Sequence, residues 1–158
     1  MFDLRLDEAA DWIRAGGYAC VALQLPEGLK SKSIGISRYL SERTGASFFF
    51  AGDPCYGACD IFDYKGKADA LVHFGHSPIP SQGDDPDVMY VEAFYGGDIG
   101  PFISAIADDL PGKIGLMATV QYVPALERAR EVLEAAGKKV MISPGDGRIS
   151  YPGQALGC

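Results

Sequence analysis

Residues 20–51 read CVALQLPEGLKSKSIGISRYLSERTGASFFFA, two apolar runs separated by an amphipathic segment. The first run, Cys20–Leu25, is typical of a buried strand, and apolar residues then recur at helical spacing from Leu29 to Leu40. Gly45 stands where a left-handed residue is expected to end the helix, and the second run, Ser47–Ala51, follows it. Strand, helix and strand in this order predict an α/β unit with parallel strands.

The same order of elements recurs near the end of the chain. We expect a strand over Ile114–Val120, a helix from about Pro124 to Ala136 that Gly137 ends, and a strand over Lys139–Ser143. The inner face of this helix is expected to consist of Leu126, Ala129, Leu133 and Ala136.

The two units are predicted to carry equivalent site residues. Counted from the first strand of its own unit, Asp53 occupies the same place as Asp146, and a cysteine follows each, Cys59 and Cys158. Ligands of parallel α/β sheets gather at the carboxyl ends of the strands, where both cysteines are expected. We therefore predict that Cys59 and Cys158 are equivalent metal ligands, and that the two Asp side chains hydrogen-bond the cysteine loops and orient them.

Further elements flank the first unit. A short helix is expected to begin with Asp7 as its cap and to stop at Gly16, before the first strand. The apolar runs Ala70–Phe74 and Val88–Ala93 predict two more buried parallel strands. A helix with Pro101 in its first position is then expected. Its apolar face would consist of Phe102, Ile103, Ile106 and Leu110.

These elements predict an α/β fold made of duplicated Rossmann-like units with parallel sheets. Residues 1–96 would form a complete first domain with the cysteine loop, and residues 97–158 the front half of a second, homologous domain. The second domain is expected to be truncated, because it supplies only two strands and one helix before Cys158.

Composition narrows the classes of function. The chain has 158 residues, 47% of them hydrophobic, and 14 Lys and Arg against 21 Asp and Glu, a formal net charge of -7. This acidity argues against direct binding of nucleic acid. An acidic N-terminus and the lack of long apolar runs predict no secretion signal and no membrane span, hence a cytoplasmic protein whose cysteines are thiols or metal ligands.

The loop Gly52-Asp-Pro-Cys-Tyr-Gly-Ala-Cys-Asp60 brings two thiols close in sequence. Read alone, Cys55 and Cys59 could chelate one metal, and soft thiolates favour zinc, copper(I) or iron–sulfur clusters. Cys55 has no counterpart in the second unit, so we interpret it as structural, with contact to the site still open. Cys20 begins a predicted strand and is interpreted as a core residue.

The two histidines of the chain stand at different points of one predicted strand. His73 lies within the apolar run and is expected to be a hydrogen-bonded core residue. His76 lies at the carboxyl end of that run and is the better candidate for contact with a cofactor. The sequence leaves the catalytic groups unassigned.

Several ordered motifs resemble one family. The segments Gln24-Leu-Pro-Glu-Gly-Leu29, Gly52–Asp60, His73-Phe-Gly-His-Ser77 and Gly153-Gln-Ala-Leu-Gly-Cys158 are similar to the N-terminal portion of archaeal diphthamide synthases. This family is 2-(3-amino-3-carboxypropyl)histidine synthase, which catalyses the first step of diphthamide biosynthesis on translation elongation factor 2.

The resemblance implies a homodimer of subunits with three similar α/β domains, each giving one cysteine to a 4Fe-4S cluster. Cys59 and Cys158 match the first two of these ligands. The family uses the open iron to bind S-adenosylmethionine, which is cleaved to a 3-amino-3-carboxypropyl radical that adds to a histidine of the elongation factor. The usual radical motif Cys-x3-Cys-x2-Cys is absent, because Phe62 takes its third place. Since the third family cysteine would lie in a third domain, this chain alone is expected to be inactive.

Two other functions stay open. One is a zinc-binding or non-catalytic dimerisation module in which Cys55 and Cys59 chelate the metal, although no second pair at zinc-ribbon spacing is present. The other is nucleotide binding by a Rossmann-like sheet, which lacks both the Gly-x-Gly-x-x-Gly and the P-loop signatures.

Overall fold

The computed structural model describes residues 1–156, except for the side chain of Gln82. Internal contacts divide the chain into two compact units, with the division between Ala93 and Phe94. Among the described residues, one compact unit contains residues 4–93, and the other contains residues 1–3 and 94–156. The first residues belong to the second unit because β1 (Phe2–Asp3) pairs antiparallel with β6 (Phe94–Tyr95).

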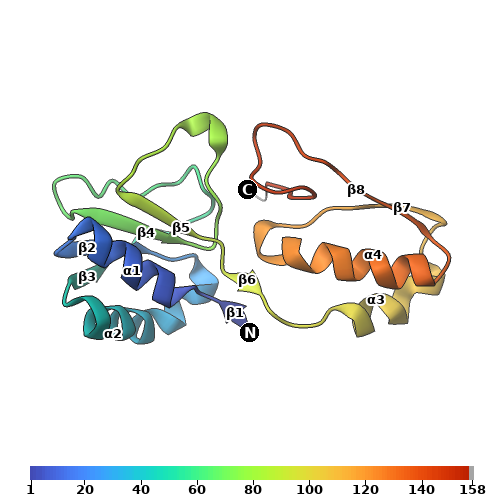
Figure 1. Ribbon diagram of the computed structural model, residues 1–158, viewed down its shortest axis with the longest axis horizontal. Coiled ribbons are helices and arrows are strands. Elements are labelled where there is room, and N and C mark those ends of the chain that lie inside the picture. Colours follow the sequence, from blue (N-terminus) through green and yellow to red (C-terminus); the bar gives the residue numbers. More distant parts are fainter. Residues whose placement is uncertain (157–158) are drawn as a thin grey trace. The chain divides into compact units, whose positions relative to one another are not determined.

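The unit of residues 4–93 contains a four-stranded sheet in the order β3-β2-β4-β5 (Figure 1). All neighbouring strands pair in parallel, which confirms the predicted α/β class. The strands are β2 (Cys20–Gln24), β3 (Ser47–Phe50), β4 (Ala70–Phe74) and β5 (Val88–Val91). Every residue of β4 is buried, as expected of a central parallel strand.

Two helices lie on one side of this sheet and pack against each other, α1 (Leu6–Gly16) and α2 (Ser33–Thr44) (Figure 1). A 3-10 turn over Glu27–Lys32 leads into α2, and Gly45, with φ +73°, ends it as predicted. The side chains turned inward include Ile13, Ile36 and Leu40, each at most 2% exposed.

The predicted start of α1 is wrong. Asp7 lies inside the first turn, and the capping position belongs to Arg5, which adopts a left-handed conformation and makes no side-chain cap. Arg5 forms ion pairs with Glu8 and, at 3.1 Å, with the buried carboxylate of Glu92. These pairs hold Arg5 at the helix entrance, so the helix begins before Asp7.

A loop covers the opposite face of the sheet. Ala22, Leu71 and Tyr64 form a buried cluster, and the connection between β3 and β4, residues 51–69, supplies Tyr64. The partly buried residues packed against this cluster are Phe49, Ile61, Phe62, Ala68 and Val88. Because the loop seals this face with its own side chains, the sheet is covered on both faces without a helix between β3 and β4.

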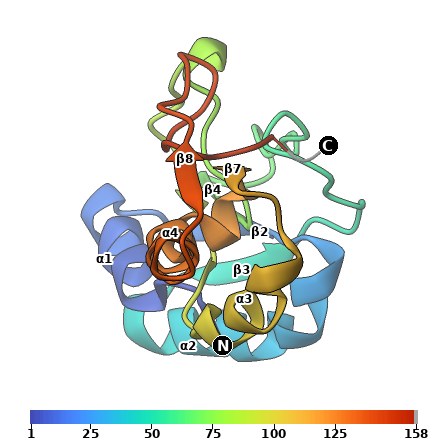
Figure 2. The ribbon, with the colours of Figure 1, turned by 90° about the vertical axis from the view of Figure 1, so that its right-hand side faces the viewer.

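The second unit contains the parallel pair β7 (Lys113–Leu116) and β8 (Lys139–Ile142). Helices α3 (Gly100–Ile106) and α4 (Leu126–Ala135) lie on the same side of this pair (Figure 2). The predicted inward residues Leu126, Ala129 and Leu133 are buried, whereas Ala136 is exposed, because α4 ends before it. The first strand is shorter than predicted, since Val120 begins a 3-10 turn.

The predicted apolar face around α3 is wrong for two of its four residues, since Ile103 and Leu110 are half-buried whereas Phe102 and Ile106 are exposed. Phe102 is 75% exposed and Ile106 47% exposed, while Gly100 is the first helical residue and Pro101 the second. The helix has only seven residues and continues as a 3-10 turn in which Ala107 is buried. The buried residues of this segment are thus the small ones, Gly100 and Ala107. Among the described helices of both units, none is long and apolar enough to cross a membrane.

Candidate metal centre

Three segments meet at the carboxyl edge of the four-stranded sheet. Gln24 ends β2 and pairs in register with His73 of β4, the neighbouring strand. The loop after β3 carries Cys55, and His76 follows the end of β4. Parallel pairing brings these strand ends to one edge, so residues far apart in sequence become neighbours.

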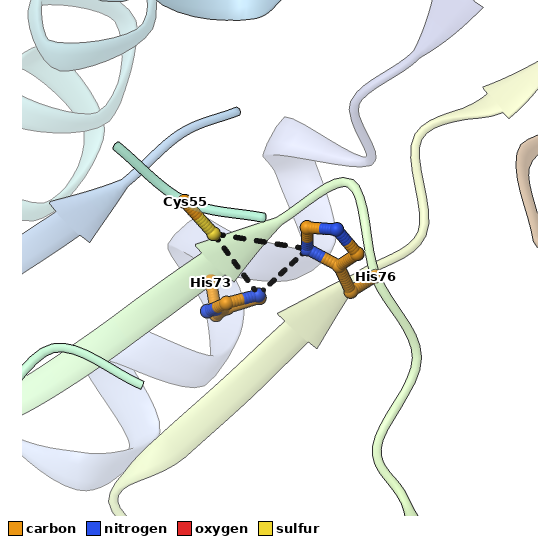
Figure 3. Close-up of side chains that lie close together, drawn as sticks. All are labelled: Cys55, His73 and His76. Carbon is orange, nitrogen blue, oxygen red and sulfur yellow. Dashed lines mark hydrogen bonds between the residues drawn. The ribbon is translucent and has the colours of Figure 1, made fainter. Parts of the chain in front are cut away.

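The side chains of Cys55, His73 and His76 face one another (Figure 3). The Cys55 sulfur lies 3.8 Å from Nε2 of His73 and 3.9 Å from Nδ1 of His76, and these two nitrogens are 2.8 Å apart. Cys55 is 6% exposed, His73 is fully buried and His76 is half-buried. A buried thiol and two imidazoles within 4.8 Å of one another form a donor set suited to one metal ion.

Gln24 determines which nitrogen of His73 carries the proton. Its amide Nε2 donates to the carbonyl of Asp60 at 2.6 Å, and its Oε1 accepts the N–H of Phe62 at 3.0 Å, so both backbone partners dictate the amide orientation. The same Oε1 lies 2.8 Å from Nδ1 of His73. An oxygen can only accept, so Nδ1 must donate, and the neutral ring presents the lone pair of Nε2 to Cys55 and His76.

Burial disfavours the charged form of all three groups. It lowers the pKa of His73 to about 3, with the neighbouring His76 adding to the effect. It also lowers the pKa of His76, against the opposing attraction of Asp60. For Cys55, burial together with the charge of Asp60 raises the pKa to about 11. A thiol with a raised pKa is a poor nucleophile, so the group is unlike a cysteine–histidine catalytic pair.

The loop that carries the cysteines is held by Asp60 rather than by the predicted Asp53. The Asp60 carboxylate accepts the backbone N–H of Tyr56 at 3.2 Å, and its own N–H donates to the carbonyl of Gly57 at 3.0 Å. Asp53 is exposed. In the second unit Asp146 does accept a loop N–H, that of Arg148 at 2.9 Å.

Of the predicted cluster ligands, the structure describes Cys59, which does not belong to this group. Cys59 is exposed on the same loop, and the metal-capable group formed by the described residues does not include it. Cys158 lies outside the described residues. The hypothesis of one chelate by Cys55 and Cys59 is thus not supported, because Cys55 turns inward to His73 and His76.

Sequence reasoning found part of this site. His73 is a buried, hydrogen-bonded residue, as predicted, and His76 lies at the strand end. Cys20 begins β2 as predicted but is only half-buried. The grouping of Cys55 with the histidines was missed. The available signal was that a thiol and two imidazoles all lie near the carboxyl ends of predicted parallel strands, but the sequence does not give the order of those strands in the sheet.

Gly75, between the two histidines, has a testable role in positioning them. Its φ is +86°, and a Cβ there would lie 2.8 Å from Cγ of Pro26. Gly75→Ala is expected to lower the free energy of unfolding by at least about 2 kcal/mol, from left-handed strain and the clash together. Urea denaturation measures this loss.

Gly45→Ala is the control. The φ of Gly45 is +73°, and a Cβ there would have no other atom within 4 Å, so backbone strain alone should cost about 1–2 kcal/mol. Equal losses in both variants would show that the Pro26 ring gives way.

Known proteins resemble this chain over nearly its whole length. Residues 25–158 match a family described as putative diphthamide synthesis protein. The 2-(3-amino-3-carboxypropyl)histidine synthase of Pyrococcus horikoshii is 36% identical over 147 residues, which are 87% of this chain and 42% of that protein. Subunit 1 of the synthase of Caenorhabditis elegans is 34% identical over 152 residues, 92% of this chain and 38% of that subunit.

A solved structure agrees with these relatives. The crystal structure of Dph2 from Pyrococcus horikoshii with a 4Fe-4S cluster superposes with a TM-score of 0.82 at 32% identity, over 99% of this chain and 48% of that one. The chain therefore spans less than half the length of these relatives. By sequence and by fold, the chain belongs to the family of diphthamide synthesis proteins.

Proposed function

We propose that this chain is part of a 2-(3-amino-3-carboxypropyl)histidine synthase, a transferase that modifies a histidine of translation elongation factor 2 with a group taken from S-adenosylmethionine. The observation that carries the proposal is the family match over residues 25–158, together with relatives of that name. We further propose that the chain carries duplicated Rossmann-like domains, the first complete within residues 1–96 and the second partial over residues 97–158.

Cys59 is the proposed first ligand of a 4Fe-4S cluster. Its thiol is exposed on a loop at the carboxyl edge of the parallel sheet, so a bulky cluster has access to it. Cys158 is the proposed second ligand, and a third cysteine would come from outside these residues. When bound, a cluster with three cysteine ligands would supply an open iron and the electron for non-canonical radical cleavage of S-adenosylmethionine.

The remaining assignments follow from the same proposal. His76, the half-buried member of the histidine pair, is the candidate contact for S-adenosylmethionine. The protein partner is elongation factor 2, the assembly a homodimer and the location cytoplasmic. The net charge of -7 is consistent with a protein partner rather than direct contact with nucleic acid.

The test is anaerobic reconstitution of the full-length protein that contains this chain, with iron and sulfide. We expect iron–sulfur absorption and, with S-adenosylmethionine and a reductant, transfer of the 3-amino-3-carboxypropyl group to elongation factor 2, detected by mass spectrometry. Cys59→Ala combined with Cys158→Ala should remove both signals, because the cluster loses two thiolates. The isolated 158-residue chain should transfer nothing.

Cys20→Ala is the matched control, since Cys20 is a half-buried thiol on the opposite end of β2 from the site. It should retain both signals. A cluster that persists in the double variant would refute the ligand assignment. The zinc or dimerisation module built on Cys55 and Cys59 has less support, because Cys55 faces His73 and His76; stoichiometric metal bound by both cysteines without iron would favour it.

A further inference from the structure

We propose that Cys55, His73 and His76 bind a single divalent metal ion of the zinc class, at a site separate from the cluster ligand Cys59. The three donor atoms come from two different segments and lie within 4.8 Å of one another. A triangle of this size accommodates one ion, whereas a four-iron cluster needs ligands spread around a larger body.

The lone pairs of the site are arranged for a cation. His73 is buried and is held by Gln24 with its Nδ1 proton pointing away from the group, so Nε2 offers its lone pair inward. Metal-binding histidines commonly donate their other N–H to an oxygen in this way. Nδ1 of His76 reaches the same point and, without a metal, donates its proton to Nε2 of His73 at 2.8 Å. A cation would take the place of that proton, His76 would carry its hydrogen on Nε2, and the Cys55 thiol would release its proton to solvent as it becomes the thiolate ligand.

The distances match a tetrahedral site after small movements. Bonds of about 2.3 Å to sulfur and about 2.0–2.1 Å to nitrogen place a tetrahedral sulfur and nitrogen about 3.6 Å apart, and two nitrogens about 3.3 Å apart. The observed separations are 3.8 and 3.9 Å for the sulfur and 2.8 Å for the nitrogens. Each differs from the ideal by half an ångström or less. His76 can supply the movement, since it is half-buried and lies beyond the end of β4.

The donor set selects the kind of metal. One thiolate and two imidazoles favour zinc or cobalt over magnesium or calcium, which prefer oxygen ligands. A bound ion would tie the loop of Cys55 to the end of β4, and Cys59 stands four residues further along that loop. The ion would therefore fix the base of the loop that presents the cluster ligand. The proposed contact of His76 with S-adenosylmethionine would use its other nitrogen, Nε2.

Cobalt(II) titration of the reduced 158-residue chain tests the site. We expect one cobalt per chain, with the intense visible bands of tetrahedral cobalt and a thiolate-to-cobalt charge-transfer band. Cys55→Ser should abolish the charge-transfer band and weaken binding more than about 100-fold, beyond the loss expected from an outer hydrogen-bond partner. Circular dichroism checks that the variant folds. Should it fail to fold, His76→Gln replaces a half-buried ligand and should weaken binding to a similar degree.

Two cysteine variants serve as controls. Cys59→Ser and Cys20→Ser should bind cobalt like the parent, because neither thiol belongs to the group. Loss of the charge-transfer band in Cys59→Ser with its retention in Cys55→Ser would overturn the proposal, as would a parent chain that binds no cobalt. The outcome is independent of the proposed transferase, since Cys59→Ser is expected to lose the iron–sulfur cluster and keep the cobalt site.

Discussion

Replacing Gln24 with leucine is expected to lower the free energy of unfolding by about 3–5 kcal/mol. The side chain is 2% exposed and serves three partners: Nδ1 of His73, the N–H of Phe62 and the carbonyl of Asp60. Leucine has a similar volume but no polar atom, so these groups lose their hydrogen bonds together. Each buried group left without a partner costs about 1–3 kcal/mol, with the Asp60 carbonyl contributing least because it lies nearest to solvent. Fluorescence of Trp12, the single tryptophan, measures the loss in urea.

Gln154→Leu is the matched control in the second unit. Gln154 is 6% exposed, and its Oε1 accepts the N–H groups of Ser150 and Tyr151. It lies outside the group of Cys55 and the histidines, so its loss should leave cobalt affinity unchanged. Gln24→Leu should weaken cobalt binding by about 10–100-fold, because His73 loses the acceptor that orients its ring. A stability loss below about 1 kcal/mol for Gln24→Leu would mean that water replaces the amide.

Phe74→Ala is expected to cost about 3–5 kcal/mol of unfolding free energy. Phe74 ends the central strand β4, is fully buried and is the largest of the fully buried side chains described. Truncation removes its apolar contacts and leaves a cavity that the sheet cannot close, because both neighbours of β4 are hydrogen-bonded along its length. Thermal or urea unfolding followed by circular dichroism measures the loss.

Phe102→Ala makes the same chemical change at an exposed site. Phe102 is 75% exposed, so we expect a change within about 0.5 kcal/mol. Comparing Phe74→Ala with Phe102→Ala separates the effect of burial on stability from the effect of the residue type. A large loss in Phe102→Ala would show that this side chain packs against a surface, as the helical pattern of the sequence predicted.

The strands and the main helices could be predicted from the sequence because local rules govern them. Cys20–Gln24 and Ala70–Phe74 are apolar runs of strand length, and Gly45 takes the left-handed conformation that its place after a helix suggests. Prediction failed at two places. At the start of α1, ion pairs of Arg5, one of them with the distant Glu92, override the capping preference of Asp7. At α3 the apolar spacing predicted an inward Phe102, whereas this side chain is 75% exposed.

The sequence predicted where each histidine lies on its strand, but it did not predict that Cys55 contacts them. Periodicity places His73 in a core strand and His76 at its end, and the motifs around Cys59 point to the family. Which residues meet depends on strand order, since β2 lies between β3 and β4 and its terminal Gln24 joins the loop to His73. Cys55 and Cys59 are neighbours in sequence but differ in burial, because the Cys55 side chain turns inward and Cys59 is exposed to solvent.

From its residues alone, this chain reveals an α/β protein of the diphthamide synthesis family and the thiol Cys59 on a strand-end loop, because short-range patterns encode strands, turns and motifs. The placement of Cys55 against His73 and His76, and the proton that Gln24 assigns, arise only when parallel strands align their ends. The physical reason is that hydrogen bonds and desolvation depend on how close atoms are in space. They do not depend on how far apart the residues are along the chain.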